Sequence, residues 1–70
     1  MIYMDDLNRE ILAYALQNAL EFGEADVGRV LPKLFQHGLD KKDISKIMPS
    51  IREIVKKVNS ISNDERMKLF

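Results

Sequence analysis

Apolar residues recur at helical spacing along three segments of this 70-residue chain, and this periodicity limits the possible folds more than any other feature. An apolar side chain at every third or fourth position lies on one face of a helix, and that face must be buried against another element. The sequence therefore predicts an all-α fold, a small orthogonal bundle of four to five short helices. The three stripes are Leu7, Ile11, Ala15 and Phe22; then Val27, Val30, Leu31, Leu34 and Phe35; then Ile44, Ile47, Met48, Ile51, Ile54, Val55 and Val58.

Residues with capping preferences predict where the first two helices begin and end. The first helix is expected at roughly 6–22, with Asp5 or Asp6 as its N-cap and Gly23 just past its end. Asp26 can cap the second helix, which Gly38 closes. Pro32 lies inside that helix, where a missing N–H should kink it or delay its true start.

The third stripe has a proline in its middle. Asp40 and Asp43 have the spacing of a capping arrangement, which predicts a start near residue 41. Pro49 leaves two interpretations, one kinked helix over 41–59 or a short helix followed by a longer one that begins near Pro49. The break is slightly favoured, because proline is well tolerated in a first helical turn.

A capping box, S-x-x-E, announces a last helix at Ser62 and Glu65. Only five residues follow it, and a helix of barely two turns is marginal alone. We therefore expect the protein to continue beyond Phe70. The predicted organisation is a helical domain over 1–60 and the start of a linker or helix over 61–70, leading into a further part.

Composition excludes several classes of protein. Hydrophobic residues make up 46% and charged residues 31%, a balance typical of globular domains. There is no cysteine, so disulfides and thiolate metal sites are excluded, which fits a reducing compartment. The sequence has neither a run of about 18 apolar residues nor a secretory leader. We expect a cytoplasmic protein with no membrane partner.

Charge is unevenly distributed although the net charge is zero. Residues 1–26 carry −5, and residues 41–59 carry +4. A basic stretch of this kind can contact phosphates, it can be one of two complementary charged faces that pack within one domain, or it can be a solvated helix face. No aromatic residue interleaves it, so base stacking is not indicated. The candidate RNA-binding residues are Lys42, Lys46, Arg52, Lys56 and Lys57.

Catalytic constellations are missing. The chain has one histidine, and its three glycines are too far apart for a phosphate-binding loop. His37 is expected at a helix C-terminus or on the surface rather than in a catalytic or metal site. We predict no catalytic residue, no metal ligand and no cofactor in this segment.

Three segments resemble parts of one enzyme family. Residues 14–19, Tyr-Ala-Leu-Gln-Asn-Ala, look like the YALxNA segment near the start of archaeal glutamyl-tRNA synthetases. Residues 25–34 are similar to that family's A-x-x-G-x-V-x-x-K-hydrophobic helix, and residues 54–62 to its IV-x-x-VNSLS segment. Order and spacing agree. The chain departs from the family at Gly23-Glu24-Ala25, where a Gly-Lys often precedes the alanine, and at Pro32.

The resemblance implies a class I enzyme that activates glutamate with ATP and magnesium and joins it to tRNA. Its catalytic signatures, of the His-Ile-Gly-His and Lys-Met-Ser-Lys types, are absent from these 70 residues. The segment would then be an appended N-terminal domain that touches tRNA, the catalytic body of the same chain, or another translation protein. Two alternatives stay open. Residues 25–34 also resemble the helical tails of tRNA-dependent amidotransferases, and the chain can be a module for protein interaction alone.

Overall fold

The computed structural model describes residues 4–69, with side chains from Asp6 onward, as four helices. They are α1 (Met4–Phe22), α2 (Val27–Gln36), α3 (Lys41–Asn59) and α4 (Asn63–Leu69). No strand occurs among these residues, and the predicted all-α bundle of four to five helices is confirmed.

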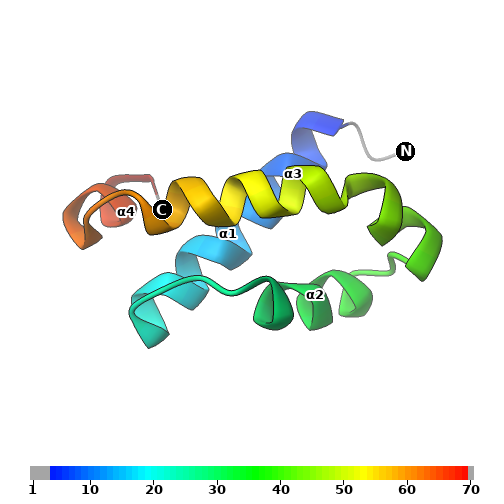
Figure 1. The fold of residues 1–70 in the computed structure, drawn as a ribbon, viewed down its shortest axis with the longest axis horizontal. Coiled ribbons are helices and arrows are strands. Elements are labelled where there is room, and N and C mark those ends of the chain that lie inside the picture. Colours follow the sequence, from blue (N-terminus) through cyan, green and yellow to red (C-terminus); the bar gives the residue numbers. More distant parts are fainter. Residues whose placement is uncertain (1–3, 70) are drawn as a thin grey trace.

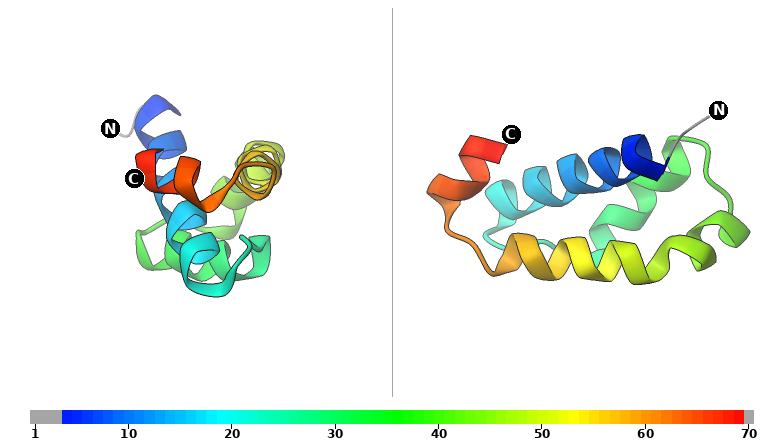
Figure 2. Two further views of the ribbon diagram at one scale, coloured as in Figure 1. Left: turned by 90° about the vertical axis from the view of Figure 1, so that its left-hand side faces the viewer. Right: turned by 90° about the horizontal axis from the view of Figure 1, so that it is seen from above.

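The two long helices run side by side in the same direction, and α2 runs back in the opposite direction, packed against both (Figure 1). In Figure 1, α1 crosses behind α3 and descends to the level of α2. The short α4 lies at the end of the bundle where α1 and α3 both end, and it contacts α1 (Figure 2). All four helices thus share one globule of 33 × 21 × 19 Å.

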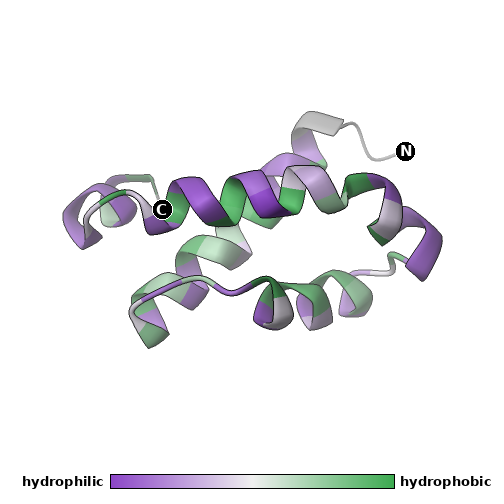
Figure 3. Ribbon diagram, viewed as in Figure 1, coloured by the Kyte–Doolittle hydropathy of each residue, from purple (hydrophilic) through white to green (hydrophobic). Residues whose placement is uncertain are grey.

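The core is built from the three predicted stripes. Ile11, Leu34 and Ile51, from three different helices, are each completely buried. Hydrophobic and hydrophilic positions alternate along α3 in Figure 3, as expected for a helix with one buried face. The sequence predicts Phe22 and Phe35 as members of the stripes, but both rings are exposed. Phe22 is the last residue of α1, and Phe35 lies at the edge of the α2 stripe, one residue before that helix ends.

Helix α1 begins earlier than predicted. Its first residue is Met4, so Asp6 lies within the first turn and does not cap the helix. An acid in the first turn is still favoured by the helix dipole. The predicted capping role of Asp5 lies outside the described side chains. Gly23 follows the helix with φ of +91°, and its N–H donates to the Ala19 oxygen at 2.7 Å, as predicted for a left-handed terminator.

Helix α2 begins directly after its predicted cap. The Asp26 carboxylate accepts from the Gly28 N–H at 2.8 Å, and Val27 is the first helical residue. Pro32 therefore does not delay the start of the helix. Its ring is exposed, and the Gly28 carbonyl that loses its donor also belongs to an exposed residue. Water can satisfy an oxygen at the surface, which lowers the cost of the proline.

Helix α3 is continuous, so the favoured break near Pro49 is wrong. Its predicted capping box is confirmed: Asp40 Oδ1 accepts from the Asp43 N–H at 2.9 Å, and Asp43 Oδ2 from the Asp40 N–H at 3.3 Å. The buried side chains on either side of Pro49 belong to one stripe. A break would turn half of that stripe away from the core, which costs more than one backbone hydrogen bond.

Helix α4 begins where the second capping box predicts. The Ser62 hydroxyl oxygen accepts from the Glu65 N–H at 3.3 Å. The helix has seven residues and packs on α1. The domain boundary that we place after residue 60 stays a prediction; within the described residues, α4 is joined to the rest of the bundle.

Candidate RNA-binding face

The predicted binding residues all lie on α3, and all are exposed. At about 100° of rotation per residue, the five buried residues of α3 fall within an arc of about 80°. Lys42, Lys46, Arg52, Lys56 and Lys57 fall within an arc of about 140° centred on the opposite side of the helix. The structure therefore places all five predicted residues on one solvent-facing side, here called the outer face of α3. The buried residues are Ile44, Ile47, Ile51, Val55 and Val58.

The outer face carries its charges in two groups. Lys42 and Lys46 are one turn apart in the first half of the helix, and Arg52, Lys56 and Lys57 occupy the second half. The exposed Lys41, which the sequence analysis did not select, lies at the edge of the first group. Between the groups, residues 47–51 contain no charged side chain. The exposed Glu53 falls inside the same arc as the second group and reduces its net charge.

Aromatic side chains are absent from α3, and the exposed rings belong to other helices. Phe22, at the end of α1, is 54% exposed, and the Arg29 guanidinium carbon lies 4.1 Å from the centre of its ring. This pair lines a groove of about 420 Å³ between α1 and α2. Tyr14 lines the same groove; burial, and then the neighbouring Glu10 carboxylate, raise the pKa of its phenol.

A second cluster of polar groups, which we call the polar junction, fixes the loop between α1 and α2. Asn18 is only 8% exposed, and its Oδ1 accepts from the Asp26 N–H at 2.8 Å. Asn59, at the end of α3, bonds both backbone groups of Ala25: its Oδ1 accepts from the N–H at 2.7 Å, and its Nδ2 donates to the oxygen at 2.9 Å. The side chains of Asn18 and Asn59 thus supply the hydrogen-bond partners that these backbone groups would have inside a helix.

The third member of the polar junction is Arg66 of α4, which is 6% exposed. Its Nε donates to the Val58 oxygen at 2.8 Å, and its Nη1 donates to the Gly23 oxygen at 3.2 Å and to Asn63 Oδ1 at 2.7 Å. Val58 and Gly23 lie at the C-terminal ends of α3 and α1, where the helix dipoles favour a cation. The guanidinium joins three helices at one point.

Sequence reasoning identified only part of this junction. Asn18 is a polar residue in a strongly apolar helix, a position that suits either burial or the surface, and the structure shows that it is buried. The roles of Asn59 and Arg66 were missed. Their hydrogen bonds reach 34 and 43 residues back along the chain, and no local pattern signals such partners.

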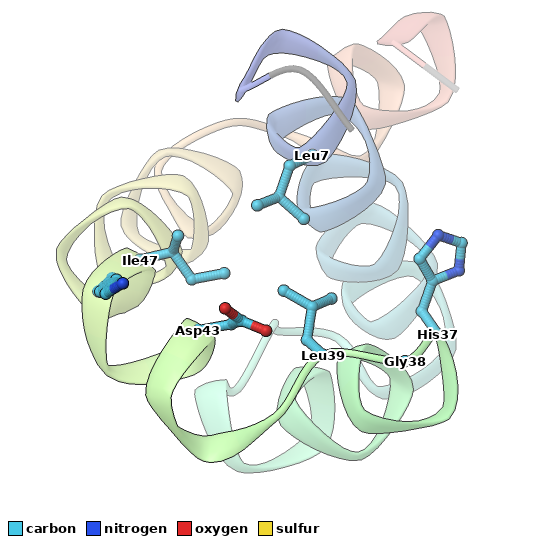
Figure 4. A pocket seen from close by; sticks show the side chains of 7 residues that line it. Leu7, His37, Gly38, Leu39, Asp43 and Ile47 are labelled. Carbon is cyan, nitrogen blue, oxygen red and sulfur yellow. The ribbon is translucent and has the colours of Figure 1, made fainter. Parts of the chain in front are cut away.

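A pocket of about 450 Å³ lies at the opposite end of the bundle from α4, where α1 begins and the α2–α3 loop turns (Figure 4). Leu7, Leu39 and Ile47 point into it, and the Asp43 carboxylate, already used in the capping box, lies at its rim. The His37 ring points away from it. His37 is exposed and caps the end of α2, as predicted. Within residues 6–69, no group of three or more histidine or acidic side chains can hold a metal ion.

No family model, no curated protein and no solved structure matches the chain. None of the helices in the described part of the chain is both long enough and apolar enough to cross a membrane.

Proposed function

We propose that this chain is the N-terminal appended domain of an archaeal-type glutamate–tRNA ligase, and that the outer face of α3 contacts the tRNA. One observation carries the assignment to this family. The three segments that resemble the synthetase, residues 14–19, 25–34 and 54–62, supply Asn18, the Ala25-Asp26 loop and Asn59 of the polar junction. Three segments far apart in the sequence thus meet in one hydrogen-bonded cluster, as expected of motifs that specify a common fold.

The proposed role in tRNA contact depends on charge. Phosphates supply most of the affinity between a protein and a nucleic acid, and lysine and arginine neutralise them. The basic residues of the outer face of α3 lie on the side of the helix opposite its buried residues, so they are free to contact phosphates. They are Lys42, Lys46, Arg52, Lys56 and Lys57. Such a face adds affinity for the tRNA backbone while leaving the choice of bases to the rest of the enzyme.

The domain has no role in the chemical step in this proposal. Glutamate activation with ATP and magnesium belongs to the remainder of the enzyme, because none of the 70 residues matches a catalytic signature of the family. The described side chains likewise offer no cluster of acids for magnesium. The domain's partners are therefore the tRNA and the catalytic body of the same chain.

The test is tRNA glutamylation by the full-length enzyme and by a form that lacks residues 1–60. We expect truncation to raise the KM for tRNA several-fold and to leave the kinetics with ATP and glutamate unchanged. A point variant of the whole enzyme, with Lys42, Lys46 and Lys56 each changed to Glu, should reproduce the effect without removing the fold. An unchanged KM for tRNA in both forms would contradict the proposed contact.

A second candidate function, docking of the domain on the catalytic body or on another translation protein, is favoured by the apolar surface of α4. Met67 and Leu69 are 64% and 57% exposed in a helix of seven residues. Changing both to Ser in the full-length enzyme should then lower its thermal stability. It should also leave the KM for tRNA at low protein concentration unaffected. An unchanged melting temperature would count against docking on the body.

A further inference from the structure

The spacing of charges on the outer face of α3 limits the shape of its ligand. Lys42 and Lys56 are fourteen residues apart in one helix, which places them about 21 Å apart along its axis. The two basic groups are held at this distance by a helix whose other face is locked in the core. A ligand that satisfies both groups must present phosphates at two places separated by a similar distance.

A duplex meets this requirement better than a single strand does. Its two backbones face each other across a groove at a fixed spacing, whereas a single strand is flexible, and proteins that bind it add aromatic rings on which its bases stack. The outer face of α3 has no aromatic residue. The exposed Phe22 and Phe35 lie on α1 and α2, and Arg29 already covers the Phe22 ring.

The outer face also offers hydrogen-bond acceptors beside the first basic group, where that group meets the uncharged residues 47–51. Pro49 is exposed and lies within the arc of the basic residues. Because proline has no N–H, it cannot donate to the Ser45 carbonyl, its usual partner four residues earlier. The exposed Ser45 lies in the same arc and adds a hydroxyl group. The surface from Ser45 to Pro49, here called the central strip, therefore places a carbonyl oxygen that lacks its normal helical donor next to the uncharged segment between the two basic groups.

We propose that the outer face of α3 binds double-stranded RNA across its wide, shallow minor groove. The first basic group lies against one phosphate backbone and the second group against the other. The central strip, which begins inside the first group and reaches into the uncharged segment, lies over the groove, where A-form RNA displays ribose 2′-hydroxyls that can donate to oxygen acceptors. This inference rests on the proposed function in one respect, the use of this face for RNA, and it names the double-helical parts of tRNA as the surface contacted.

The central strip also predicts a preference for RNA over DNA. A DNA duplex of the same sequence has no 2′-hydroxyl, so the Ser45 carbonyl gains no donor from its sugars. Changing Pro49 to Ala restores the N–H that occupies this carbonyl inside the helix. The variant keeps every charge of the outer face, so it separates recognition of the ribose from attraction to phosphate.

The experiment measures binding of the 70-residue chain to three fluorescent probes of one sequence by anisotropy, at several salt concentrations. The probes are an RNA duplex of about 16 base pairs, the corresponding DNA duplex, and the single RNA strand. We expect the RNA duplex to bind several-fold more tightly than either of the others. Lys42→Gln and Lys56→Gln should each lower the slope of log K against log salt by about one. The matched control Lys33→Gln, in the groove between α1 and α2, should leave the slope unchanged.

Pro49→Ala should weaken binding to the RNA duplex several-fold and leave binding to the DNA duplex unchanged, with helix content checked by circular dichroism. Tighter binding to the single strand, equal binding to the two duplexes, or unaltered salt slopes in the lysine variants would each overturn the inference. These results are independent of the glutamylation test. RNA-duplex binding with no effect of truncation on the KM for tRNA would refute the proposed function alone, and the reverse result would refute the minor-groove mode alone.

Discussion

Replacing Arg66 with Met tests whether one buried guanidinium holds α4 on the bundle. Methionine preserves most of the apolar volume of the arginine stem and removes all three hydrogen bonds, so the change isolates the polar contacts from the loss of packing. The Val58 oxygen loses its donor inside the protein, and the Gly23 oxygen loses its donor at a partly buried site. The Asn63 side chain is exposed, so its oxygen can accept a hydrogen bond from water instead.

The magnitude follows from these partners. A buried carbonyl left without a donor costs about 1–3 kcal/mol, and hydrogen bonds from a charged group lie at the upper end of this range. We expect a total loss of about 2–3 kcal/mol, a large part of the roughly 4–10 kcal/mol available to a domain of this size. The melting temperature should fall by roughly 10–20 °C, since 1 kcal/mol corresponds to about 4–8 °C in small domains.

The assay is urea unfolding of the 70-residue chain, followed by far-ultraviolet circular dichroism. Arg52→Met is the matched control, because it removes a guanidinium from the exposed outer face of α3 and should change the free energy of unfolding by less than about 0.5 kcal/mol. Arg66→Lys, which retains the charge but not the fork of donors, should recover only part of the stability. A loss for Arg66→Met no larger than that for Arg52→Met would refute the role assigned to the polar junction.

Three further predictions concern the core, a proline and a titrating group. Leu34→Ala, at a fully buried position, should cost about 2–5 kcal/mol in denaturant unfolding, and a change under about 0.5 kcal/mol would show that α2 is not packed as described. Pro32→Ala should stabilise the chain by about 1–2 kcal/mol in the same assay, because it restores a helical N–H at an exposed position; a loss of stability would contradict this. The pKa of Tyr14 is raised in the folded state, so its neutral phenol adds stability that is fully present below about pH 10 and is lost as the pH rises through the folded pKa. The Tyr14→Phe variant should therefore lose less stability than the parent chain between neutral and strongly alkaline pH. Equal losses of stability in the two chains would exclude the effect.

Local patterns in the sequence predict where most of the helices begin, but they predict fewer of the contacts that join one helix to another. The starts of α2, α3 and α4 follow from caps that lie within three residues of the groups they bond, so the sequence contains the complete signal. The break at Pro49 was predicted incorrectly because a local rule for proline was weighed without the burial of the surrounding stripe. That burial depends on α1 and α2, which are distant in the sequence.

The candidate binding face could be predicted because it depends on only one helix. Once the buried stripe of α3 is recognised, the rotation per residue assigns Lys42, Lys46, Arg52, Lys56 and Lys57 to the opposite side. The polar junction could not be predicted in this way. Asn59 and Arg66 have unremarkable local sequence, and their roles depend on a loop that passes beside them only in the folded bundle.

The polar junction also has a consequence for the order in which the chain can fold during synthesis. The first two helices emerge from the ribosome early, but the loop between them has backbone groups whose partners are Asn59 and Arg66. Until those residues emerge, the Ala25 N–H and the Gly23 oxygen can bond only water, and the hairpin of α1 and α2 lacks its connection to the later helices. The nascent chain should therefore remain sensitive to proteases over most of its length and become resistant in one late step, when α4 leaves the exit tunnel.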